Sequence, residues 1–293
     1  MNKEKALGLS LISHLLLSLT ESCMLSVLTA MSGNVLLHRI FSLLFTPIRF
    51  VFPLMIYKKA TGFLPFITPM TKPRNTKNAT SVKSKVLIYV FAVSLTVTVL
   101  NTVGILTSLF LSFFGKSMPG AAPTTSLDTV YTFIKSVCLA ALLEETLLRG
   151  AALHAFSERK PMTGIVFSAI LFALMHGNLY QFFYTFTAGL IIAAFTAMTG
   201  SLILAVTVHF GANLVTFVFS LLSTRLEPRL YNTVSMGVFI VFTVTSAVSA
   251  ILYFTRLKRE KNDTPPCFKT EGIPREILIY VAVAVIVSIV NVL

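Results

Sequence analysis

Long apolar runs separated by short polar or basic stretches make up most of this chain. Most runs are roughly 18–25 residues long and show no alternation of apolar and polar positions, so they predict membrane helices rather than barrel strands. We expect helices at about 6–31, 35–57, 86–114, 129–155, 162–176, 179–199, 201–222, 233–254 and 276–293. The fifth is short for a full crossing, so it can also be partly inserted. The pattern predicts an all-α polytopic membrane bundle of eight or nine hydrophobic segments.

The polar stretches between the runs divide the chain into three parts. The first run follows Lys3 and Lys5 and resembles a signal peptide, but it has no small-residue cleavage motif, so we expect it to remain as the first helix. Long loops are predicted at 58–85 and 256–275, both rich in Lys and Arg. We therefore divide the chain into N-terminal membrane helices with a basic loop (1–125), a catalytic core (126–224) and C-terminal membrane helices (225–293).

The composition supports a membrane location and argues against a nucleic-acid partner. The chain is 55% hydrophobic and only 12% charged, whereas a soluble domain is about 25% charged. Its net charge is +13, but the basic residues lie between the apolar runs, as juxtamembrane charges do. Most Lys and Arg fall on one side if the segments alternate from a cytoplasmic N-terminus, which predicts this orientation. We expect the protein to reside in the cell (plasma) membrane. The three cysteines are far apart and indicate neither disulfides nor a metal knuckle.

The apolar stretch at 137–153 contains three charged residues, Glu144, Glu145 and Arg149. Placing a charged side chain in hydrocarbon costs a free energy of roughly a few kcal/mol or more. Such side chains therefore face a protein interior or a water-filled cavity. Glu145 and Arg149 are four residues apart on a helix and can pair, whereas Glu144 points about 100° away. One carboxylate is then held ionised while the other is free to exchange protons. The alternative is an ion network that only fixes helix packing.

Two further polar motifs lie in later apolar runs. The first, F-A-L-M-H, places Phe172 and His176 on one helix face, and the second, H-F-G-A-N, does the same for His209 and Asn213. Taken singly, the first motif can be a histidine bound to a backbone carbonyl and the second an inter-helix clamp. Together with the carboxylates they can hydrolyse a bond, since a carboxylate and an imidazole can activate water and an imidazole and an amide can stabilise an oxyanion.

The ordered set E-E-x-x-x-R, F-x-x-x-H and H-x-x-x-N on separate apolar helices resembles the CPBP family of CAAX-protease and bacteriocin-processing intramembrane endopeptidases, also called Abi. This family includes the Ras-converting CAAX endopeptidase. The resemblance covers about 129–222 and implies that Glu144 is the general base, assisted by His176. It also implies an oxyanion site formed by His209 and Asn213, with supporting roles for three residues: Glu145, Arg149 and Phe172.

The resemblance leaves the metal requirement open. Glu144, His176 and His209 could ligate zinc, and the family was long regarded as metalloproteases. The chain has no H-E-x-x-H motif, however, so we favour a metal-free mechanism without a cofactor.

Three functions remain open at this point. The first is an endopeptidase acting on a membrane-bound peptide or lipidated protein, such as a prenylated C-terminus, a leader peptide or a bacteriocin. The second is a catalytically silent membrane scaffold or bacteriocin-immunity protein with the same fold. The third is a transporter, which predicts two related halves that the sequence lacks.

Several polar residues lie outside the motifs. We expect Lys135 to snorkel to the membrane interface. Arg49 is predicted either to pair with a carboxylate in the cavity or to lie near the cytoplasmic lipid headgroups. For the histidines outside the motifs we expect packing or interfacial roles; these are His14, His38 and His154.

Overall fold

The computed structural model describes the chain except for residues 65–81, 117–121, 160, 258–273 and 291–293. The described residues form helices and contain no strand, which confirms the predicted all-α membrane bundle. Seven of their helices are long and apolar enough to cross a membrane. Much of the two predicted basic loops lies outside the described residues.

The helices follow the predicted apolar runs closely. Their bounds are α1 Lys3–Ser32, α2 Val35–Thr61, α3 Val82–Ser112, α7 Pro161–Met175, α8 Leu179–Thr199, α9 Leu202–Ser223, α10 Pro228–Leu257 and α11 Arg275–Val290, together with a composite helix over residues 126–155. The largest difference is at α10, which begins at Pro228 rather than near Thr233. Run length alone located these helices because a crossing needs about 20 apolar residues.

Tight turns join several of these helices. Gly33 ends α1 in the left-handed conformation (φ 59°), and the Asn34 side chain then accepts a hydrogen bond from the Leu37 N–H to begin α2. Gly200 ends α8 in the same way (φ 67°), and the Ser201 hydroxyl caps α9. Since a left-handed residue followed by an N-cap reverses the chain within a few residues, these neighbours pack antiparallel.

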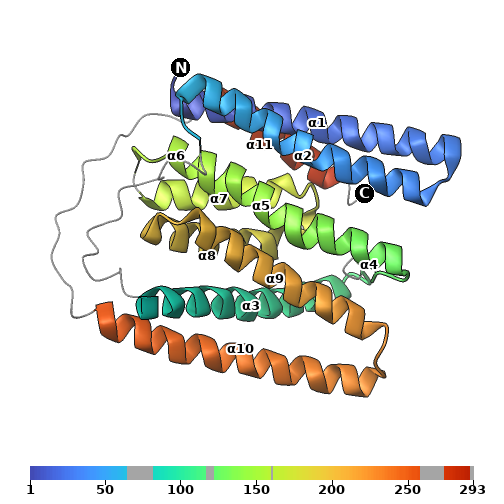
Figure 1. Cartoon of the computed structure of the whole chain (residues 1–293), viewed down its shortest axis with the longest axis vertical. Helices are drawn as coiled ribbons and strands as arrows, with labels where there is room; N and C mark the ends of the chain where they lie inside the picture. The colour runs from blue at the N-terminus through green and yellow to red at the C-terminus, as the bar shows by residue number, and fades with distance from the viewer. Residues whose placement is uncertain (65–81, 117–121, 160, 258–273, 291–293) are drawn as a thin grey trace.

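The bundle has two outer groups of helices with the central helices between them (Figure 1). On one side α1 packs against both α2 and α11, and on the other side α3 packs against α10. Between them, α8 and α9 contact α3, and α9 also contacts the middle of the composite helix. α7 packs against α8. The central group, formed by the composite helix, α7, α8 and α9, carries all three motifs.

The composite helix is the main departure from the sequence prediction of one regular helix. It consists of α4 (Ser126–Thr132), a π-helical segment η1 (Phe133–Leu139), α5 (Ala140–Glu145), a second π-helical segment η2 (Thr146–Ala152) and α6 (Leu153–Ala155). Within η1 and α5 there is no Gly or Pro that could have signalled the change. π-Segments are rare and are frequent at functional sites.

Ion pairs tie several helices together at one end of the bundle. Arg159, after α6, contacts both carboxylate oxygens of Glu4 on α1, at 2.5 and 2.7 Å. Lys5 lies 3.7 Å from Glu276 at the start of α11. Segments expected on the same side of the membrane therefore meet at the same end. That this end is cytoplasmic, and that the membrane is the plasma membrane, remain predictions.

Candidate active site

The composite helix presents the acidic pair at the junction of α5 and η2. The Ala140 N–H binds the Lys135 carbonyl five residues back, and the Leu153 N–H binds the Leu148 carbonyl in the same way. A five-residue step replaces the usual four-residue step, so the turn widens and side chains beyond it rotate relative to a regular helix. Glu144 and Glu145 lie between the two widened turns.

Glu145 and Arg149 form a fully buried ion pair, as their spacing predicts. Both side chains are 0% exposed, and Arg149 Nη1 donates to Glu145 Oε1 at 3.0 Å. The same oxygen accepts a hydrogen bond of 2.8 Å from His209 Nδ1 on α9. Arg149 Nη2 donates to the Gly189 carbonyl on α8 at 3.1 Å. The pair thus joins the composite helix to two other helices.

Phe172 connects the three motifs through its ring. The Arg149 guanidinium lies over this ring, 4.6 Å from its centroid, in a cation–π contact. The rings of His176 and His209 meet it nearly perpendicularly, at centroid distances of 4.9 and 5.5 Å. Such edge-to-face contacts are favourable because the positive edge of one ring meets the negative face of the other. Phe172 therefore lies between the two histidines and the guanidinium.

The hydrogen bonds of the two histidines fix which ring nitrogen is committed. His176 Nδ1 lies 2.9 Å from the Phe172 carbonyl oxygen, which can only accept. His209 Nδ1 faces a carboxylate oxygen that also binds a guanidinium, so it too acts as the donor. In both rings Nδ1–H is occupied, and Nε2 is the nitrogen left for a substrate or water.

Glu144 differs from its neighbour Glu145 in forming no hydrogen bond with a described residue. Its side chain is half-buried, and its Oε2 atom is buried without a hydrogen bond to any described residue. Glu145 Oε1, by contrast, has two donors. The structure brings Glu145, Arg149, Phe172, His176 and His209 into one chain of contacts, and it leaves the Glu144 carboxylate without a direct hydrogen bond to either histidine.

Asn213 contacts the composite helix from α9. Its Nδ2 atom donates to the Ser136 carbonyl of η1 at 2.7 Å. In a regular α-helix this carbonyl would accept the Ala140 N–H, which here binds Lys135 instead. An amide group carries two N–H bonds, so one of them remains for a substrate. The roles of Ser136 and Gly189 could not be predicted, because each acts through its backbone carbonyl.

Gly189 allows α7 and α8 to approach closely beside the site. A Cβ atom at this position would lie 3.0 Å from Ala169 Cα and 3.1 Å from Phe172 Cδ1. We expect Gly189→Ala to lower the free energy of unfolding by about 1–3 kcal/mol, because overpacking displaces neighbours, and to reduce activity by moving Phe172. Thermal unfolding in detergent checks the first effect. The control is Gly104→Ala on α3, where a Cβ would meet nothing within 4 Å; equal losses in both variants would contradict the packing argument.

The residues do not form a complete zinc site. No group of three or more His, Cys, Asp or Glu side chains in the described part of the chain is arranged to hold a metal ion. Glu144, His176 and His209 therefore lack the geometry of a common ligand set, which needs ligands about 2 Å from one ion. We derive no step through a metal.

A comparison with family models locates the same region. Residues 126–215, which include all three motifs, match the family described as type II CAAX prenyl endopeptidase Rce1-like. This region is therefore similar to the CAAX protease family. With the apolar helices, the match supports a CAAX-type intramembrane protease in general. Searches of curated proteins and of solved structures found no match.

Two charged residues outside the three motifs make contacts that differ from the sequence predictions for them. Lys135 does not snorkel as predicted: its Nζ atom donates to Ser42 Oγ and lies near Glu21, because α1 and α2 provide polar partners within the bundle. Arg49 pairs with Glu21 of α1 at 2.9 Å. This partner is a carboxylate within the bundle but not one of the glutamates of the predicted cavity, so the structure shows a third arrangement for this residue. Both contacts lie outside the three motifs.

Proposed function

We propose that the chain is an intramembrane endopeptidase that cleaves a peptide bond in a membrane-bound peptide or lipidated protein, with Glu144 as the general base. The observation that supports this most is the contrast between two adjacent carboxylates. Glu145 Oε1 is bound by both Arg149 and His209, whereas neither oxygen of Glu144 has a hydrogen bond to a described residue; the buried Oε2 atom of each glutamate has no such bond. A buried, unpartnered carboxylate is costly, which favours a role in which a water or substrate supplies the missing hydrogen bond.

In the proposed reaction, Glu144 takes a proton from water while the water oxygen attacks the scissile carbonyl carbon. The new C–O bond forms as the carbonyl π electrons move to oxygen, and His176 orients the water through Nε2. The C–N bond then breaks as the carbonyl re-forms, and Glu144 returns the proton to the leaving amine. General acid–base assistance of this kind contributes roughly 10²–10⁴-fold to the rate.

His209 and Asn213 are proposed to stabilise the oxyanion. Asn213 has one amide N–H beyond the one bound to Ser136. His209 donates from Nε2 only when the ring carries both protons, since Nδ1–H is already committed to Glu145. The Glu145 carboxylate then compensates the positive ring, so we assign it and Arg149 to positioning His209. Low polarity around such donors strengthens their effect on a developing charge.

A cleavage assay tests this function directly. We expect purified protein in lipid nanodiscs to cleave a quenched fluorogenic peptide with a farnesylated cysteine near its C-terminus. His176→Ala should lower the rate by roughly 10²-fold or more, because the water loses its orienting group. His38→Ala on α2 is the matched control, since the His38 side chain forms no hydrogen bond with a described residue, and it should retain activity.

The same assay separates the alternatives. A catalytically silent scaffold or immunity protein would give no cleavage, and the His176→Ala variant would keep any cellular phenotype. A strong chelator should leave the rate unchanged. Loss of activity with chelator and its recovery with zinc would overturn the metal-free proposal.

A further inference from the structure

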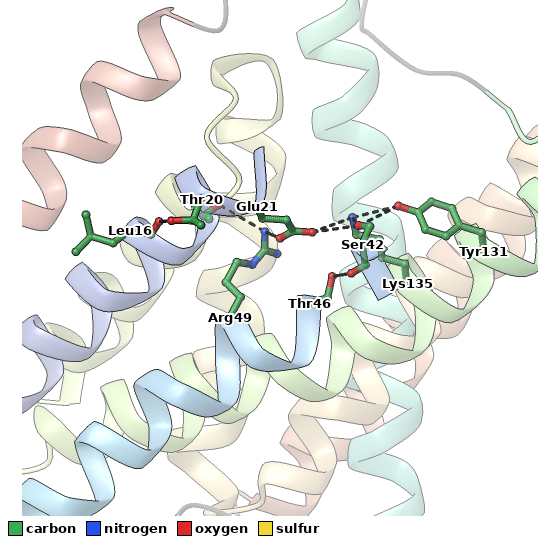
Figure 2. Close-up of polar contacts among 9 residues, drawn as sticks. Leu16, Thr20, Glu21, Ser42, Thr46, Arg49, Tyr131 and Lys135 are labelled. Atoms are coloured by element: carbon green, nitrogen blue, oxygen red, sulfur yellow. Dashed lines mark hydrogen bonds and ion pairs between the residues drawn. The ribbon is translucent and has the colours of Figure 1, made fainter. Parts of the chain in front are cut away.

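A second polar cluster lies where α2, packed against α1, meets η1 of the composite helix (Figure 2). We call its members, Glu21, Ser42, Arg49, Tyr131 and Lys135, the Glu21 cluster. Glu21 is only 2% exposed. Its Oε2 atom accepts a hydrogen bond from Arg49 Nη1 at 2.9 Å, and its Oε1 atom accepts one from Ser42 Oγ at 3.1 Å. One intramembrane carboxylate on α1 therefore holds two side chains of α2.

Lys135 connects this cluster to the composite helix. Its Nζ atom donates to Ser42 Oγ at 2.5 Å and to the Tyr131 hydroxyl at 3.2 Å, and lies 3.8 Å from Glu21 Oε1 (Figure 2). An ammonium group within a membrane bundle is costly unless it is paired, so these contacts resist withdrawal of the side chain. An ion pair between Arg39 of α2 and Asp128 of α4 holds α2 to the segment that precedes η1.

The residue after Lys135 contacts the active site. Lys135 lies in η1, and its own carbonyl accepts the Ala140 N–H across the widened turn. The Ser136 carbonyl, which lacks that partner, accepts the hydrogen bond from Asn213 instead. If η1 returned to a regular α-helix, the Ala140 N–H would bind the Ser136 carbonyl and compete with the Asn213 amide for this acceptor. A π-segment is less favourable than an α-helix, so it needs outside contacts to persist.

We propose that the Glu21 cluster is a positioning device for Asn213: by anchoring Lys135, it keeps η1 in the π-register that presents the Ser136 carbonyl to the Asn213 amide. This inference rests on the proposed function only for its effect on catalysis. Lys135 does not touch the proposed reacting atoms and acts through its neighbour in the chain. Glu21, Ser42 and Arg49 lie outside residues 126–215, so the match to the protease family does not include them.

The first test measures kinetics. We expect Lys135→Met to lower kcat by at least about tenfold, since small misplacements of a catalytic group are costly, with KM changed less than about twofold because no substrate contact is removed. Lys59→Met, at an exposed lysine near the end of α2, is the matched control and should leave both constants unchanged. An unchanged kcat in Lys135→Met, or equal losses in the two variants, would overturn the proposal.

The second test needs no activity and uses a double-mutant cycle in thermal stability. If Lys135 acts through Ser136 on Asn213, Asn213→Ala should lower Tm in the wild-type background and have less than half that effect in the Lys135→Met background. Additive shifts would mean that the cluster only stabilises the fold, and would overturn the inference. Non-additive shifts in a protein that cleaves no peptide would support the coupling while the proposed function failed.

Discussion

Replacing Glu144 with glutamine should reduce kcat of the proposed peptidase by roughly 10²–10⁴-fold, because the amide cannot accept the proton of the attacking water. Glutamine keeps the size of the side chain and removes its charge. Since the Glu144 side chain has no hydrogen-bond partner in the described structure, the substitution breaks no hydrogen bond. We therefore expect unchanged membrane abundance and an unchanged or slightly higher Tm.

The adjacent glutamate provides the sharpest comparison. Glu145→Gln should lower Tm as well as activity, because it leaves the buried Arg149 guanidinium without its anion and weakens the bond to His209. Glu227→Gln, at an exposed glutamate between α9 and α10, is the matched control. The measurement is peptide cleavage together with thermal unfolding for all three variants. Wild-type kcat in the Glu144→Gln variant would remove this residue from the mechanism.

Replacing Arg149 with methionine is expected to lower the free energy of unfolding by about 3–5 kcal/mol, because it leaves a buried carboxylate without its main counter-charge. The guanidinium also binds the Gly189 carbonyl and lies over the Phe172 ring. Its loss therefore loosens the packing of α8 and removes a contact that holds the ring between His176 and His209. Activity should fall with stability.

The double variant Glu145→Gln/Arg149→Met distinguishes charge from packing. Removing both charges eliminates the unpaired carboxylate, so we expect the double variant to be more stable than Arg149→Met alone. Denaturation in detergent micelles of fixed composition gives the comparison. If Arg149→Met unfolds with a free energy within about 1 kcal/mol of wild type, the buried pair contributes no more than an exposed ion pair does. That result would show that His209 alone compensates Glu145.

The sequence determined the features that depend on residues close together in the chain. Run length and low charge predicted the membrane helices, and α8 has the predicted bounds, 179–199. The four-residue spacing of Glu145 and Arg149 predicted their ion pair, which the structure confirms. The functional assignments of Glu144, His176, His209 and Asn213 remain predictions that follow from the motifs and the family resemblance.

Only the tertiary structure decided how the helices engage one another. The sequence treated 129–155 as one regular helix, and no Gly or Pro marked η1, the π-segment whose Ser136 carbonyl binds Asn213. It also gave no means of finding that His209 binds Glu145, or that Lys135 reaches Ser42 and Glu21 rather than the lipid headgroups. The physical reason is that apolarity and helical spacing act along the chain, whereas each of these bonds depends on which turns of separate helices face each other. That alignment is set by the packing of the whole bundle.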